Sequence, residues 1–342
     1  MKEAHIFVED TINTALSEGA SDIFFLPQEK NFNVRIRING IQKSIAEVPH
    51  EYGEMCVAHI KALASLLTYR TRISQDGVIR KFDNAELRIS TLPTICGERV
   101  SIRIMQERSS VRFLEDLGFQ TEAMVAIKKM TLRPNGLTIL TGPTGCGKTT
   151  TIYAMIRELL RNSQDPASII TIEDPVECAV DGISQTSVSK GEDEWGYAKA
   201  LRAALRQDVK TLIIGEMRDK EVVKVALDAA LTGHRVITTY HAGDIPSVFA
   251  RMLHQGFEPF LIAAALSGVV TQRLVKSESG SERIPVAATL TLDDTWRDFI
   301  SDNPPLCEIR RKIASTPSAD LTAEASRMES AGVITKNWKL EI

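Results

Sequence analysis

The chain has 342 residues, of which 43% are hydrophobic and 25% charged, and its formal net charge is −3. This composition is typical of a globular protein with more than one core and argues against a disordered or fibrous chain. A dedicated nucleic-acid-binding protein usually carries a basic excess, which this chain lacks. The five cysteines are scattered without any Cys-x-x-Cys pair, which argues against a disulfide framework or a zinc site and suits reduced thiols in the cytoplasm.

No apolar stretch is long enough to suggest a membrane span. The most apolar one, at 259–270, falls short of the ~20 residues needed to cross a bilayer, so we expect a buried core helix there. The N-terminus, with acidic Glu9 and Asp10, does not resemble a signal peptide.

The pattern over residues 1–105 predicts a small α+β domain. An amphipathic helix is expected at 6–18, ended by Gly19, and a second helix at 52–69. Alternating apolar and polar side chains predict strands, at 34–38, 86–91 and 99–105. The polar segment 106–118 reads as a linker.

Residues 119–276 read as a second domain with a mostly parallel sheet. Apolar strands alternate with helical patterns there, as in repeated βα units; the strands are expected at 137–141, 168–173, 211–215 and 236–240. The region 277–342 is expected to be mainly helical.

A glycine-rich segment follows the first of these strands and matches the phosphate-loop pattern Gly-x-x-x-x-Gly-Lys-Thr. Its backbone N–H groups and the start of the next helix would surround a phosphate chain. Lys148 would contact the β- and γ-phosphates of ATP, and the Thr149 hydroxyl would bind Mg²⁺. The expected nucleotide-binding residues are Gly142, Pro143, Thr144, Gly145, Cys146, Gly147, Lys148, Thr149 and Thr150.

Two acids end apolar strands of the same predicted sheet. Glu216 follows the strand 211–215, and Glu173 ends the strand 168–173. Because ligands of open α/β sheets lie at the carboxyl ends of the strands, both acids should face one nucleotide. We assign Glu216 to the metal, directly or through water, and Glu173 to the attacking water, with the reverse assignment left open.

Histidines and arginines supply further candidates. His234 and His241 flank the strand 236–240, and His241, at its carboxyl end, could sense the γ-phosphate. In the first domain Arg88, Arg99 and Arg103 lie on or beside alternating strands. Composition alone makes these arginines a solvated face.

Taken together, these segments resemble the bacterial type II secretion and type IV pilus ATPases. The resemblance covers about 20–276 and includes four boxes in the family's order: Walker A at 142–150, the Asp box at 172–177, Walker B at 212–219 and the His box at 232–242. The segment 201–208 is similar to the one that precedes Walker B in the family, and Gln272-Arg273-Leu274 to the usual end of the domain. In the first domain, 20–23, 75–77, 88–94 and 97–99 also resemble family segments.

The resemblance implies an α/β fold, with a RecA-like P-loop ATPase domain after a PAS-like α+β domain and before a helical tail. It implies that Arg88 and Arg103 reach ATP held mainly by the second domain, and it adds His234 to the nucleotide-binding residues. The family's members form rings of six subunits in the cytoplasm, at the inner face of the membrane. There they move an inner-membrane platform protein, so that pilin-like subunits are added to or withdrawn from a fibre.

Several features depart from the family's common pattern. We find no tetracysteine module, so no zinc is expected, and no long N-terminal docking domain. Walker B is preceded by Asp208-Val209-Lys210 in place of Asp-Pro-Asp, and the C-terminal box of retraction motors is not found. Cys146 stands where a small hydroxyl residue is more usual; it could confer sensitivity to thiol reagents or act only as a small neutral side chain. The compact plan looks most like that of competence-pseudopilus ATPases.

Other functions remain as alternatives. One alternative within the same broad group is a pilus retraction ATPase. Another is a type IV secretion or nucleic-acid-translocating motor, although no direct nucleic-acid contact is expected. Outside it, a P-loop kinase would need a lid, and we see no arginine-rich segment for one. A nucleotide-gated binding module would not need both Glu173 and Glu216.

Overall fold

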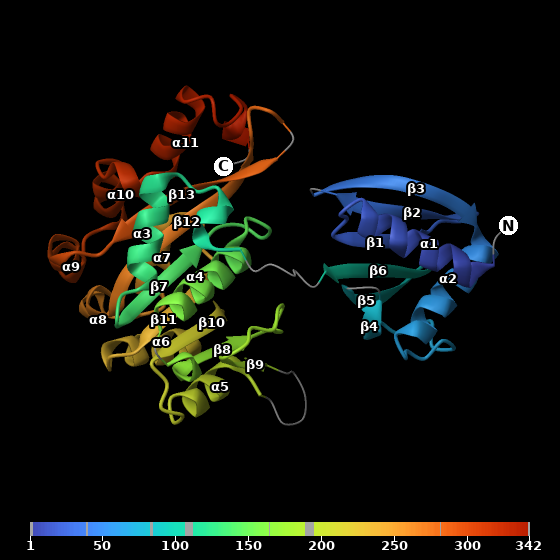
Figure 1. Cartoon of the computed structure of the whole chain (residues 1–342), viewed down its shortest axis with the longest axis horizontal. Helices are drawn as coiled ribbons and strands as arrows, with labels where there is room; N and C mark the ends of the chain where they lie inside the picture. The colour runs from blue at the N-terminus through green and yellow to red at the C-terminus, as the bar shows by residue number, and fades with distance from the viewer. Residues whose placement is uncertain are drawn as a thin grey trace. The chain divides into compact units, whose positions relative to one another are not determined.

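The computed structural model describes residues 3–38, 40–82, 85–106, 112–163, 165–188, 195–280 and 282–340. It divides into two compact units, Met1–Ser109 and Ser110–Ile342 (Figure 1). The part of the predicted linker at 107–111 lies outside the described residues.

The first unit is an antiparallel sheet with two helices on one face (Figure 1). Its strand order is β3-β2-β1-β6-β5-β4 in the described residues. Apolar side chains from alternate strand positions, such as Phe25 and Ile36, form a core with Val8 and Ile60 of the helices. The elements are α1 (Ala4–Ser17), β1 (Asp22–Pro27), β2 (Asn31–Ile38), β3 (Ile41–Pro49), α2 (His50–Leu63), β4 (Asp76–Phe82), β5 (Ala85–Thr94) and β6 (Gly97–Gln106).

The helix predicted at 52–69 is shorter than expected. α2 ends at Leu63, and Ser65 adopts a left-handed φ of 57°. Left-handed backbone ends a right-handed helix, and the apolar spacing of Leu66 and Leu67 therefore does not continue it.

The second unit is a mostly parallel sheet covered on both faces, as the repeated βα pattern predicts. The strand order is β13-β12-β7-β11-β10-β8-β9, and only β12 and β13 run antiparallel among the described strands. One apolar core lies between the sheet and α5 to α8, and another between the sheet and α3 with α4 (Figure 1). The strands are β7 (Gly136–Thr141), β8 (Ile169–Glu173), β9 (Ser184–Ser187), β10 (Thr211–Met217), β11 (Arg235–Tyr240), β12 (Leu266–Lys276) and β13 (Arg283–Thr291). The helices are α3 (Thr121–Thr131), α4 (Lys148–Asn162), α5 (Tyr197–Ala204), α6 (Lys220–Leu231), α7 (Ile245–His254) and α8 (Pro259–Ala265).

The apolar stretch at 259–270 is not one helix, so that prediction was wrong. α8 ends at Ala265 and β12 begins at Leu266. β12 begins with buried residues, whereas α8 buries only Ile262, Ala263 and Ala265 and leaves Phe260 64% exposed. A short apolar run has no period that separates a helix from a strand. Gly268 marks the strand, because a Cβ there would lie 2.6 Å from the sulfur of Met130 on the covering helix.

The C-terminal region is helical after one further strand. β13 pairs with β12 along nine residues, so the sheet extends beyond residue 276. Three α-helices follow in the described residues, and the last packs with Trp338 against Val275 and Val286. They are α9 (Asp294–Ser301), α10 (Leu306–Ala314) and α11 (Leu321–Ser330), of which α9 and α11 are N-capped by Asp293 and Asp320.

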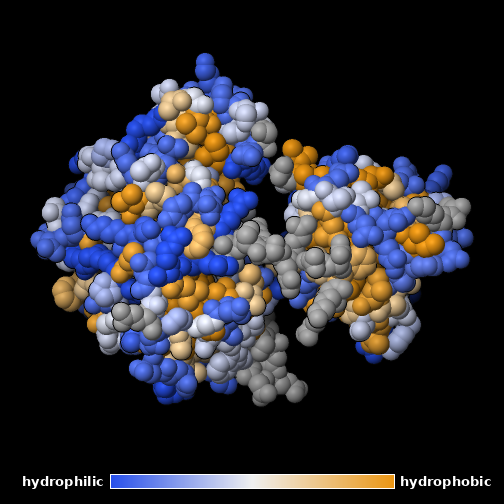
Figure 2. Space-filling model, in the orientation of Figure 1, coloured by the Kyte–Doolittle hydropathy of each residue, from blue (hydrophilic) through white to orange (hydrophobic). Residues whose placement is uncertain are grey.

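Hydrophilic residues predominate on the face of the second unit that Figure 2 shows, and apolar residues appear there as small separate patches. No helix in the described part of the chain combines the length and the hydropathy needed to span a bilayer.

Candidate active site

The loop between β7 and α4 has the geometry of a phosphate-binding turn. β7 ends at Thr141 and α4 begins at Lys148. Gly142 has a φ of 144°, and a Cβ on it would lie 2.4 Å from the carbonyl oxygen of Gln272. Gly147 has a φ of 88° at the N-cap of α4. Only glycine fits these positions, and the fifteen-residue helix directs its positive end at the loop.

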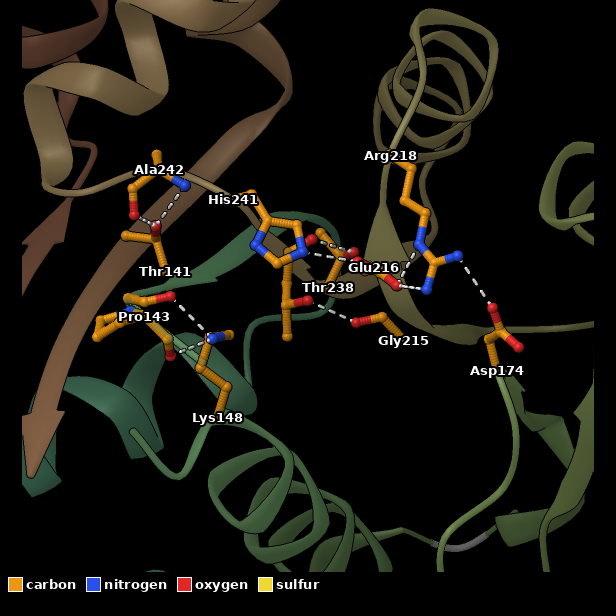
Figure 3. A network of polar contacts seen from close by, with 12 residues as sticks. Thr141, Pro143, Lys148, Asp174, Gly215, Glu216, Arg218, Thr238, His241 and Ala242 are labelled. Carbon is orange, nitrogen blue, oxygen red and sulfur yellow. Dashed lines mark hydrogen bonds and ion pairs between the residues drawn. The ribbon is translucent and has the colours of Figure 1, made fainter. Parts of the chain in front are cut away.

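The Lys148 ammonium lies over this loop. It donates hydrogen bonds of 2.8 Å to the carbonyl oxygens of both Gly142 and Pro143 (Figure 3). Thr144 and Gly145 belong to the loop, and Thr149 and Thr150 lie in the first turn of α4. The structure therefore brings all nine predicted loop residues together in one turn.

Cys146 lies inside the loop and is only 3% exposed. Burial raises the pKa of its thiol, against the smaller lowering effects of the Lys148 and Arg273 charges. The Lys148 ammonium lies 3.9 Å from the sulfur. The side chain is thus a small neutral group packed under the loop.

Strand β12 supports the loop from the side. Gln272, 1% exposed, donates a hydrogen bond of 2.6 Å from Nε2 to the Cys146 carbonyl oxygen. Its Oε1 accepts a hydrogen bond of 3.0 Å from the Thr151 hydroxyl. One amide thus connects the loop, the first helix turn and β12.

Glu216 and His241 form a pair at the same edge of the sheet as Lys148 (Figure 3). Glu216 lies at the end of β10 and His241 follows β11. His241 Nε2 lies 2.8 Å from Glu216 Oε2, and the Arg218 guanidinium contacts Oε1. Burial alone would raise the pKa of Glu216, but the hydrogen bonds from Arg218 and His241 outweigh it and hold the pKa below its usual range.

Glu173 ends β8 in a different environment. It is 8% exposed, and its carboxylate accepts three hydrogen bonds from neutral donors. The donors are the hydroxyl of Tyr153 on α4 at 2.7 Å, the hydroxyl of Thr171 at 2.5 Å and the amide of Gln185 at 3.3 Å. Glu216 therefore contacts the charged guanidinium of Arg218 and the imidazole of His241, whereas Glu173 lies in a neutral, buried network.

The structure does not bring His234 to the phosphate loop. It lies before β11, at the opposite edge of the sheet, where its Nδ1 is 3.0 Å from the Ala229 carbonyl oxygen. The six residues of β11 separate it from His241. At about 3.3 Å per residue this separation is about 20 Å.

Arg88 and Arg103 of the first unit lie opposite each other on β5 and β6. Arg103 Nε lies 3.1 Å from Asp22 Oδ1, and Arg88 Nε lies 3.3 Å from Glu86 Oε1. Both project from the sheet face opposite α1 and α2, because their strand neighbours Leu87 and Ile102 point into the core. That the two arginines contact a nucleotide stays a prediction.

Residues 2–313 match the model of the family described as Type II/IV secretion system protein. The chain belongs to this family. It is 38% identical to the type IV pilus assembly ATPase PilB of Thermus thermophilus over 276 residues, which are 80% of this chain and 31% of PilB. It is also 38% identical to the type II secretion system ATPase E of Vibrio cholerae over 269 residues, which are 78% of this chain and 53% of that protein.

A solved structure of the pilus retraction motor PilT with bound ADP has a similar fold, with a TM-score of 0.75 and 26% identity over 96% of this chain and 94% of PilT. The expected α/β fold, with its parallel sheet and helical C-terminal region, is thus confirmed, and the PAS-like character of the first unit stays a prediction. This chain spans 31% of the first and 53% of the second of the two curated relatives named above.

Two residues of the site in this Type II/IV secretion family member were missed from the sequence. Gln272 was noted only as part of a segment that resembles the family, and Arg218 only as part of Walker B. Gln272 lies within β12 between Thr271 and Arg273, and Arg218 directly follows β10, so a polar side chain at the end of an apolar run is the signal that could have marked them. Their partners lie far away in sequence or on another strand, so the contacts needed the structure.

Proposed function

We propose that this chain binds ATP with Mg²⁺ at residues 142–150 and hydrolyses the bond between its β- and γ-phosphates. The observation that carries the proposal is the position of the Lys148 ammonium over the loop, with the Glu216–His241 pair at the same sheet edge (Figure 3). A cation, helix N-terminal N–H groups and a carboxylate at one edge are the parts that phosphoryl transfer requires.

The residues fit a magnesium–nucleotide complex. The hydroxyl of Thr149 in the first helix turn and the carboxylate of Glu216 are oxygen donors of the kind that Mg²⁺ prefers. When bound, the ion would neutralise charge on the phosphate oxygens. Lys148 would exchange its carbonyl contacts for the β- and γ-phosphates.

The surroundings of the two acids favour different roles for them. Glu216 pairs with His241 and lies at the edge that Lys148 occupies, which supports a direct part in hydrolysis. Glu173 accepts three hydrogen bonds in a buried network, which supports a role in fixing α4 against β8. We therefore propose that Glu216 serves the metal and the water, in place of our sequence-based assignment of the water to Glu173.

We further propose that hydrolysis is converted into domain movement in a homohexameric ring at the cytoplasmic face of the inner membrane. Arg88 and Arg103 would then reach the nucleotide when the two domains close. A platform protein of a type IV pilus, competence pseudopilus or type II secretion fibre would be the partner. The likeness to a pilus assembly ATPase and a type II secretion ATPase supports this proposal.

Retraction is the second candidate. The observation that favours it is the similarity to PilT along nearly the whole of both chains. An assembly motor and a retraction motor would share the ATPase chemistry and differ in the direction of fibre movement, which piliation of a deletion strain would show.

The test of the ATPase proposal is Lys148→Ala. This variant should lose nucleotide affinity and ATP turnover, whereas Lys129→Ala, at an exposed position on α3, should retain both. ATP turnover is measured as the magnesium-dependent release of phosphate. A steep rise of turnover with protein concentration would report ring formation. Near-normal turnover by Lys148→Ala would refute the proposal.

A further inference from the structure

Arg218 connects acidic residues at the ends of two neighbouring strands. β8 and β10 pair in parallel, and Asp174 follows the first while Glu216 lies at the end of the second. The Arg218 guanidinium contacts Glu216 Oε1 through Nε and one terminal nitrogen, and its other terminal nitrogen lies 3.0 Å from Asp174 Oδ2 (Figure 3). A single side chain therefore joins the Asp box to Walker B.

The guanidinium suits this position for a geometric reason. Its N–H donors form a rigid planar fork, so contacts on two of its edges fix its orientation and that of the carboxylates. Without it, Glu216 and Asp174 would be two like charges on adjacent strand ends. The Arg218 side chain is partly accessible to solvent, with 46% of it exposed.

Glu216 is thus held on both oxygens. Arg218 contacts Oε1, and His241 Nε2 lies 2.8 Å from Oε2. His241 lies on the Lys148 side of Glu216 and Arg218 on the other side (Figure 3). Together these two contacts fix the orientation of the carboxylate from both sides.

We propose that Arg218 is a positioning residue, which fixes the carboxylate of Glu216 for hydrolysis by anchoring it to Asp174. The inference rests on the proposed function, in which Glu216 serves the chemical step. It assigns Arg218 no contact with the substrate. Since the phosphate loop does not depend on Arg218, its loss should lower kcat and leave nucleotide affinity nearly unchanged.

The experiment is a double-mutant cycle with Arg218→Gln, Asp174→Asn and the double variant. Each single variant should lower kcat by about tenfold to a hundredfold, since a misplaced catalytic group costs on this order. The double variant should lower kcat no further than the worse single variant, because both changes break one link. Affinity for a nonhydrolysable ATP analogue with Mg²⁺ should stay within about threefold in all of them, a change of less than 1 kcal/mol.

Arg218→Lys separates positioning from charge. It keeps the positive charge and should preserve folding, but an ammonium lacks the rigid planar fork that fixes the orientation of both carboxylates. Its kcat should therefore stay well below that of the natural chain. Full recovery of kcat by lysine would show that charge alone matters and would overturn the proposal.

A matched control lies at the other ends of the same two strands. Lys210 precedes β10 and Asp165 precedes β8, and their side chains form an exposed ion pair of 3.1 Å. Because exposed pairs contribute about 0–1 kcal/mol, Lys210→Gln and Asp165→Asn should leave kcat unchanged.

Three outcomes would overturn the inference: an unchanged kcat in Arg218→Gln, single effects that multiply in the double variant, or a fall in nucleotide affinity that parallels the fall in kcat. If the unmodified chain and the control variants hydrolyse ATP while Arg218→Gln does so equally well, the positioning role alone fails. If the unmodified chain hydrolyses no ATP, the proposed function fails with it.

Discussion

The phenol of Tyr153 donates a hydrogen bond of 2.7 Å to the buried carboxylate of Glu173. Its oxygen also accepts hydrogen bonds from the backbone N–H groups of Cys178, at 3.0 Å, and Glu177, at 3.3 Å. One hydroxyl thus joins the helix behind the phosphate loop to the end of β8 and to the segment that follows it.

Tyr153→Phe should destabilise the second unit. The change removes a donor from a buried carboxylate and an acceptor from two N–H groups, and leaving such groups unpaired costs about 1–3 kcal/mol. Urea unfolding followed by tryptophan fluorescence would measure this, because all three tryptophans lie in the second unit. Tyr69→Phe is the control, since Tyr69 is 75% exposed in the first unit. Equal unfolding midpoints for Tyr153→Phe and the natural chain would contradict this role.

Gln272→Ala should weaken nucleotide binding. The variant loses the hydrogen bond to the Cys146 carbonyl oxygen and the one from Thr151, so the loop is no longer fixed from the side. We expect affinity for a fluorescent ATP analogue to fall about tenfold, as for the loss of one good hydrogen bond. Gln272→Glu keeps the acceptor for Thr151 but loses the donor, and should be at least as weak. Unaltered affinity in both variants would show that the loop keeps its shape without this contact.

The thiol of Cys146 should react slowly with iodoacetamide. Alkylation requires the thiolate, and a raised pKa lowers the thiolate fraction at any pH below it. At pH 8, mass spectrometry should therefore show Cys307, which is exposed, labelled well before Cys146. Buried Cys56, whose pKa burial raises to about 11, should be labelled as late as Cys146. The difference in labelling rate between Cys307 and the two buried cysteines should narrow as the pH rises, since thiolate then forms at the buried sites.

ATP turnover gives the matching functional measurement. Brief alkylation at pH 8 should leave hydrolysis intact, in both the natural chain and Cys307→Ser. Rapid loss of turnover together with early labelling of Cys146 would instead support the thiol-sensitive alternative.

Lys61→Met should loosen the first unit locally. Lys61 is fully buried, and its ammonium lies 2.8 Å from Glu98 Oε2 and 2.9 Å from the Arg70 carbonyl oxygen. Removing one partner leaves the Glu98 carboxylate buried and uncompensated, which costs about 3–5 kcal/mol. Hydrogen–deuterium exchange should quicken in peptides of α2 and β6 but not in those of β10 and β11. The double variant Lys61→Met/Glu98→Leu should exchange more slowly than Lys61→Met, and the opposite order would contradict the argument.

Regular patterns made much of the second unit predictable. β7, β8, β10 and β11 are short apolar runs followed by a motif or an acid, and each lies within two residues of its predicted place. The boundary between α8 and β12 could not be read, because an apolar run has no period that separates helix from strand. β13 was missed within a region that is otherwise helical. The PAS-like character of the first unit, the domain boundaries and the ring stay predictions.

The site was predictable only where one segment carries the chemistry. The phosphate loop is contiguous, so its nine residues could be named from the pattern. His234 and His241 looked equivalent because each flanks β11, but the direction of the strand separates them to opposite sheet edges. The neutral donors around Glu173 come from α4, β8 and β9, and no local spacing reveals such a network.

The position of Gln272 on β12 has a consequence for how this chain can vary in length. Alternate residues of a strand face opposite sides, so losing one residue from Leu266–Lys276 would turn Thr271 or Arg273 toward the loop in place of the amide. The same slip would misalign β13, which is matched to β12 residue by residue. Substitutions at this strand are therefore easier to tolerate than single-residue insertions or deletions, whose harm would spread from the phosphate loop to the C-terminal helices.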